Sequence, residues 1–205
     1  MDTYSLLKFV HVLGFLMMGG GLLGVFISEW RAFATNNLYV FTEAARYTVI
    51  LRFSLVVPGA LVVLISGTIL IFHLDLGFFE EPWLVGMWGL LIIEGFEGNT
   101  LTRKHILHSR RLANQAFEAG ALSEEVRSRA RGPLSIFTHF LDLPIFIVIV
   151  YCGVAKPETW TEVVIATVIS FAVAAALSMT IPRLHQRAGA VSGDPSGPAS
   201  RGESP

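Results

Sequence analysis

The stretch LLKFVHVLGFLMMGGGLLGVFISE, residues 6–29, decides the fold class of this chain. A helix that crosses the hydrocarbon core of a bilayer, about 30 Å thick, needs roughly 20 residues at about 1.5 Å each. Between Leu6 and Ser28 only Lys8 and His11 are ionisable, so this segment is long and apolar enough to span a membrane. An ionisable side chain within a span marks a functional candidate, and His11 is therefore the first residue to explain.

The composition also indicates a membrane protein. Of the 205 residues, 53% are hydrophobic and 15% are charged, whereas charged residues make up about 25% of an average soluble domain. The single cysteine, Cys152, excludes an intrachain disulfide and any multi-cysteine metal or iron–sulfur site. The residues before Leu6 lack the basic region of a signal peptide, so we expect the first span to be retained. We expect no nucleic-acid partner, and the lipid bilayer is the partner that the composition implies.

Four further apolar segments predict a multi-pass bundle. The five predicted spans cover about residues 6–29, 51–72, 83–101, 134–154 and 160–181. We therefore predict an all-α polytopic membrane helical bundle with five transmembrane helices, a four-helix core plus one, in a single domain over residues 1–187. Residues 102–132 are expected to form a cytoplasmic helical loop. Residues 188–205 are rich in Gly, Ser, Pro and Ala, which predicts a disordered tail.

The distribution of basic residues predicts the orientation. Nearly all of the 15 Lys and Arg residues lie around the first loop, in the third loop and in the tail. The positive-inside rule places these segments in the cytoplasm. The N-terminus is then outside and the C-terminus cytoplasmic.

The outer half of the predicted bundle holds His11. Gly14, Met18 and Gly21 follow it at i+3, i+7 and i+10, so they share its helical face and are expected to leave a groove that a flat macrocycle would fit. At comparable depth lie Met87 on the third span and His73 at the end of the second. The alternative is a structural histidine that is hydrogen-bonded to a neighbouring helix.

The inner half holds a second polar layer. Glu94 and Glu97 share one face of the third span, and His139 and Asp142 share one face of the fourth. An acidic side chain near mid-bilayer costs about 2.5 to 3.5 kcal/mol, so these four residues are expected to face each other. Three interpretations stay open: a satisfied structural cluster, a proton or cation path, and a site for a divalent metal held by all four residues.

Three stretches carry a resemblance to known families. They are Lys8-x-x-His11 with the glycines that follow it, PGALVVLISGTIL at residues 58–70, and HFLDLPIFIVIVYCGVAKP at residues 139–157. The first resembles the opening of the HemJ-type protoporphyrinogen oxidases and the CopD-like copper-resistance proteins of bacteria. Together, over about residues 5–157, they resemble more closely a family of predicted integral membrane proteins, domain of unknown function 2269.

This resemblance implies a bundle of four core helices that holds b-type haem, with His11 at the position of the HemJ-type histidine ligand. The HemJ-type W-L-H-x-K motif reads W-L-V-G-M here, so Met87 stands where the lysine would be. That departure counts against protoporphyrinogen oxidase activity. Methionine can ligate haem iron opposite histidine. The predicted ligand pair is therefore His11 and Met87, with His73 as the substitute.

These observations leave three functional hypotheses. The first is a multi-pass protein of the bacterial inner membrane that binds haem b in a redox or haem-related role; whether it is an enzyme stays open. The second is a cation or proton carrier that uses the cluster of carboxylates and histidine. The third is a non-catalytic subunit of a larger membrane assembly or a homo-oligomer, associated through small-residue faces at Gly20 and Gly24 and at residues 166, 170, 174 and 178.

Overall fold

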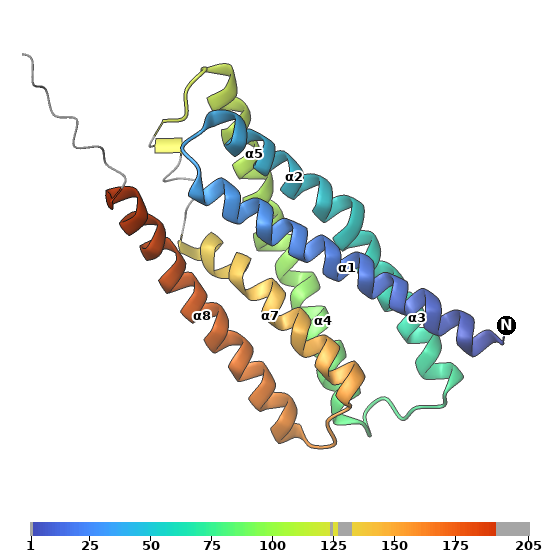
Figure 1. The fold of residues 1–205 in the computed structure, drawn as a ribbon. Coiled ribbons are helices and arrows are strands. Elements are labelled where there is room, and N and C mark those ends of the chain that lie inside the picture. The colour runs from blue at the N-terminus through green and yellow to red at the C-terminus, as the bar shows by residue number, and fades with distance from the viewer. Residues whose placement is uncertain (1, 124, 127–132, 192–205) are drawn as a thin grey trace, which may run out of the picture.

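The computed structural model describes residues 2–123, 125–126 and 133–191, with the side chains of residues 133–136, 138–139 and 181–191 excepted. Within these residues the fold is all-α and contains no strand, as predicted. The contiguous helical elements form five long rods, and successive rods run in opposite directions (Figure 1). Residues 188–191, predicted as the start of the disordered tail, are instead the helical end of the last rod. The rest of the predicted tail, from residue 192 onward, lies outside the described residues.

The rods divide into nine helical elements. They are α1 (Thr3–Ala34), α2 (Leu38–Leu51), η1 (Arg52–Val56), α3 (Val57–His73), α4 (Pro82–Glu97), η2 (Gly98–Thr102), α5 (Arg103–Glu118), α7 (Pro133–Ala155) and α8 (Trp160–Val191) among the described residues. The second rod joins α2, η1 and α3 without a break, and the third joins α4, η2 and α5 in the same way (Figure 1). The predicted loop after the third span is therefore, up to Glu118, a direct continuation of that helix.

Three segments of the described chain are long and apolar enough to cross a membrane: Thr3–Ala34, Leu38–His73 and Trp160–Thr180. Phe140–Ala155 is a shorter apolar helix. The 36 residues of Leu38–His73 exceed the roughly 20 that a bilayer requires, so this rod projects beyond the hydrocarbon core. We still predict that all five rods cross the membrane. The side of the membrane on which each rod ends is also a prediction.

A turn of π-helix interrupts each of the two longest rods. The turn η1 lies immediately before Val57 and Pro58, and Val57 donates its N–H to the carbonyl of Arg52, five residues back. Proline cannot continue the i→i−4 ladder because it has no N–H, and a wider turn accommodates the lost bond. The second π-turn, η2, begins at Gly98 at the end of α4.

Helices α1 and α3 pack at very close range through glycines. A Cβ atom on Gly59 would lie 2.6 Å from the backbone nitrogen of Met18 and 2.9 Å from the carbonyl oxygen of Gly14. A Cβ on Gly14 would lie 3.0 Å from the backbone nitrogen of Val63. In lipid, where apolar burial gives no extra driving force, this close backbone contact is a main source of helix association.

We expect Gly59→Ala to destabilise the protein by about 1–3 kcal/mol, because the added methyl group meets backbone atoms that cannot rotate away. Gly89→Ala is the matched control, since a Cβ there has nothing within 4 Å and alanine favours the helix by about 0.5–1 kcal/mol. Reversible unfolding in mixed detergent micelles measures both changes. Equal stability of the two variants would contradict the close approach of α1 and α3.

The remaining helices complete the bundle around α7. Its buried residues Ile145, Ile149 and Cys152 form one core cluster with α4 and with Ala174 of α8. Ala174 and Ser170 are both buried, so at these two positions the small-residue stripe of the last helix packs inside the bundle. The predicted oligomer face on α8 is thus at least partly used within one chain.

Candidate functional site

A large groove opens at the end of the bundle that holds the N-terminus of α1. Its volume is about 800 Å³, within the range of about 300–1,000 Å³ for small-molecule sites. Residues of α1, α3, α4 and α7 line it, and most of them are apolar, including Phe15, Leu70, Leu84 and Phe146. The groove therefore suits a large, mainly apolar ligand.

Glycines shape this groove, but not the ones predicted from the sequence. Gly14 and Gly21 were expected to clear it together with Met18, and that prediction is wrong. All three are buried in α1, and a Cβ on Gly21 would lie 2.9 Å from the backbone nitrogen of Val56. Their face of α1 packs on the rod formed by η1 and α3. Sequence periodicity shows which residues share a face, but not which neighbour covers that face.

Four other glycines line the groove: Gly19, Gly20, Gly67 and Gly153. Gly20 has open space around it, since a Cβ there would meet nothing within 4 Å. A Cβ on Gly67 would lie 3.1 Å from Cε1 of His11, so the absence of a side chain at Gly67 lets the imidazole lie against α3.

His11 is half-buried at the wall of the groove, and one of its nitrogens is already engaged. Nδ1 lies 2.9 Å from Oγ of Ser66. The Ser66 hydroxyl donates its hydrogen to the carbonyl of Val62, so in this network it accepts one from Nδ1–H. We assign the tautomer on that basis. Nε2 then carries the lone pair, and the backbone of Val63 also lies within hydrogen-bonding reach of the ring.

This arrangement combines the two interpretations of His11. The hydrogen bond to a neighbouring helix, expected of a structural histidine, is present. The same bond also orients the ring and fixes its tautomer, as the hydrogen bonds of metal-ligating histidines do. Ser66 was not predicted, although a hydroxyl on the second span at the depth of His11 was a usable signal.

The other two predicted ligands lie in different surroundings. Met87 lines the groove from α4, and a Cβ on Gly153 would lie 3.5 Å from its sulfur. His73 is exposed at the end of α3, where its ring stacks on Tyr4 with a centroid distance of 6.4 Å. Met87 is therefore a groove residue, and His73 is not among those that line the groove.

Two lysines also line the groove near the end of the bundle. The Nζ atom of Lys8 lies 5.9 Å from the centre of the Tyr4 ring, and that of Lys156 lies 5.2 Å from the centre of the Trp83 ring. These cation–π contacts hold two positive charges close to an otherwise apolar ligand site. Lys156 had no predicted role.

The other half of the bundle contains a buried polar cluster. Arg52, the first residue of η1, is 6% exposed and donates a hydrogen bond to the carbonyl of Gly98, the first residue of η2. A Cβ on Gly98 would occupy the space of the guanidinium group. The two π-turns are thus joined through one buried arginine.

Carboxylates surround this arginine, and three of them, Glu94, Glu97 and Asp142, were expected to lie close together. Glu94 interacts with Asp142, Glu97 and Arg52. Both carboxylate oxygens of Glu97 accept from the Thr102 hydroxyl, at 2.7 and 3.0 Å. Glu29, which is also buried, belongs to the same cluster and was missed; its signal was a carboxylate at the very end of the first span.

The structure describes only three of the four side chains that were predicted to bind a metal ion. The side chain of His139 lies outside the described residues. Among the side chains that are described, no three of His, Cys, Asp or Glu form a group that could hold a metal ion. A divalent metal held by Glu94, Glu97, His139 and Asp142 together therefore stays a prediction. Asp142 is buried, and its Oδ1 has no hydrogen-bond partner in the described part of the chain.

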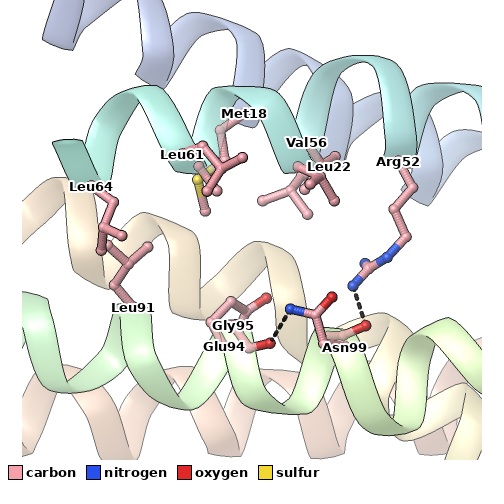
Figure 2. A pocket seen from close by; sticks show the side chains of 13 residues that line it. Met18, Leu22, Arg52, Val56, Leu61, Leu64, Leu91, Glu94, Gly95 and Asn99 are labelled. Atoms are coloured by element: carbon pink, nitrogen blue, oxygen red, sulfur yellow. Dashed lines mark hydrogen bonds between the residues drawn. The ribbon is translucent and has the colours of Figure 1, made fainter. Parts of the chain in front are cut away.

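A smaller cavity of about 240 Å³ lies beside this cluster, between α3 and α4. Figure 2 shows Arg52, Glu94 and Asn99 at one end of it and Leu61, Leu64 and Leu91 toward the other. Asn99 donates its side-chain N–H to the carbonyl of Gly95 at 2.9 Å. The cavity therefore has one polar end and one apolar end.

Comparison with known proteins supports the family resemblance. The sequence model of a family described as "Predicted integral membrane protein (DUF2269)" matches residues 5–157. This match confirms the resemblance to that family and the extent inferred from the sequence. No curated protein and no solved structure matches the chain.

Proposed function

We propose that this chain, which belongs to the family of predicted integral membrane proteins DUF2269, binds b-type haem in the groove between α1, α3, α4 and α7. The observation that carries the proposal is His11. Its Nδ1 is held by Ser66 of the neighbouring helix, which leaves the lone pair of the imidazole on Nε2. A neutral imidazole with one nitrogen anchored and the other available is the arrangement that a haem iron requires.

The rest of the groove fits the same ligand. A volume of about 800 Å³ and a mainly apolar lining suit a macrocycle, and glycines on three helices leave room for a flat ring. Met87 supplies a thioether from α4, a known partner of histidine on haem iron. Lys8 and Lys156 supply the positive charges that two propionate groups need. When bound, haem supplies one-electron redox chemistry at a potential that its ligands and surroundings set.

The visible spectrum of the purified protein tests this proposal. After expression with ample haem, we expect a Soret band and, on reduction with dithionite, the sharpened bands of a six-coordinate b-type haem. Haem content per chain, measured after extraction, should approach one. A protein that folds but shows no Soret band would refute haem binding.

A second candidate, a proton or cation carrier, is favoured by the buried carboxylate of Asp142 with its unpartnered Oδ1. A carboxylate in this position can take up a proton or help to bind a cation. Proton and cation flux in liposomes distinguishes this candidate from the first. Flux that Glu97→Gln abolishes would support the carrier, and flux absent from the unaltered protein would exclude it.

A further inference from the structure

We propose that the smaller cavity, between α3 and α4, is a binding site for a membrane-soluble hydroquinone. One ring hydroxyl would occupy the polar end at Arg52, Glu94 and Asn99, and the apolar tail would leave between α3 and α4 into the lipid. This site lies in the other half of the bundle from the groove of His11. Its occupancy does not require haem.

The size of the cavity fits one substituted aromatic ring. Its volume is about 240 Å³, and an apolar cavity of about 150 Å³ is known to bind benzene. The apolar lining comes from both helices, with Leu61 and Leu64 on α3 and Leu91 on α4. Such a lining favours a planar, largely apolar group over a strongly hydrated one.

The cavity is accessible from the side of the bundle. Leu61 lines it and is 53% exposed. Gly95 and Asn99, on the opposite wall, are also exposed. Since α3 packs on α1 while α4 packs on α7, the seam between α3 and α4 borders the surface of the bundle, which faces lipid in a membrane. A ligand dissolved in the bilayer can enter here without passing through water.

The polar end favours an uncharged headgroup over an anionic one. Arg52 is the one basic side chain that lines the cavity among the described residues, and it already bonds the Gly98 carbonyl. Glu94, Glu97 and Asp142 lie around it, and of these Glu94 lines the cavity. A phosphate or a fatty-acid carboxylate would have to leave water for this buried site, where Arg52 is already bonded to a backbone carbonyl. An uncharged headgroup avoids that cost.

The hydrogen-bonding groups favour a ligand that donates. One Asn99 N–H bonds the Gly95 carbonyl, its side-chain oxygen is left to accept, and Glu94 presents a carboxyl group to the cavity. Behind Glu94, Asp142 keeps an acceptor atom without a partner. The site therefore offers acceptor oxygens to a ligand that donates. A hydroquinone brings two O–H donors, whereas the corresponding quinone brings none.

Calorimetric titration of the purified full chain tests the proposal. The probe is a benzohydroquinone with a ten-carbon alkyl tail, kept reduced with excess dithionite, and the same compound in its oxidised form without reductant. We expect saturable binding of the reduced probe at one site per chain and weaker binding of the oxidised probe. The same titration on the His11→Ala variant, which is expected to lack haem, measures binding of the probe in the absence of haem.

Two tryptophan variants of α3 locate the site. Leu61→Trp places a bulky ring in the cavity from an exposed position, and we expect it to weaken binding at least about tenfold, equal to about 1.4 kcal/mol. Ile65→Trp is the matched control, because Ile65 is 58% exposed one turn further along α3 and does not line the cavity. It should bind the probe as the unaltered protein does.

A third variant tests the role of the carboxylate. Glu94→Gln replaces an acceptor oxygen with a donor, so it should reduce the preference for the reduced probe over the oxidised one. The proposal is overturned if the reduced probe shows no saturable binding, or if Leu61→Trp and Ile65→Trp have equal effects. Competition by an anionic phospholipid at equal affinity would also overturn it, since that result assigns the cavity to a lipid.

Discussion

Replacing His11 by alanine is expected to remove haem from the purified protein. In the proposed site Nε2 of His11 is a direct ligand, and Ser66 holds the imidazole through Nδ1 at 2.9 Å. Alanine removes the ligand but leaves the helix intact, because it is a strong helix former. The Soret absorbance per chain should fall to background. Circular dichroism should stay unchanged, which separates loss of the ligand from loss of the fold.

The other predicted ligands provide graded controls for this result. Met87→Ala should retain haem and change its absorption spectrum, since His11 would still hold the iron while the thioether would be gone. His73→Ala should leave the spectrum unchanged, because His73 stacks on Tyr4 at the end of α3 instead of lining the groove. An unchanged Soret band in His11→Ala, with loss of haem in His73→Ala, would reverse the assignment of these two histidines.

Arg52→Met is expected to destabilise the protein by about 3–5 kcal/mol, the usual cost of removing one partner from a buried charged network. Arg52 is 6% exposed, and it stabilises the charges of Glu94, Glu97 and Asp142 while donating to the Gly98 carbonyl. Methionine fills a similar volume without the charge. Reversible unfolding in mixed micelles measures the difference.

Arg46→Met is the matched control for this prediction. Arg46 lies on the same rod and forms an exposed pair with Glu43 at 3.3 Å, with side chains that are 62% and 52% exposed. Such a surface pair contributes about 0–1 kcal/mol. A cost for Arg52→Met as small as that for Arg46→Met would show that the cluster does not depend on its arginine.

Residue patterns in the sequence predicted some of the residues of the groove and of the polar cluster, but not all of them. His11 and Met87 were both predicted from the sequence, and both line one groove. Glu94 and Asp142 were also expected to face each other, and the two interact. The prediction that Gly14 and Gly21 shape the groove was wrong, because both are buried. Gly14 and Gly20 look alike in sequence, yet one contacts α3 and the other faces open space.

The sequence alone determined that this chain is an all-helical membrane protein, because apolar length and charge distribution are properties of each segment by itself. It also determined which ionisable residues the membrane helices carry. Only the tertiary structure decided what each of them meets. Ser66 fixes the tautomer of His11, Arg52 joins two π-turns at Gly98, and Asp142 keeps an unpartnered oxygen. Each of these features depends on side chains from different helices. Which atoms meet is set by the distance between the helices and by the rotation of each helix about its own axis.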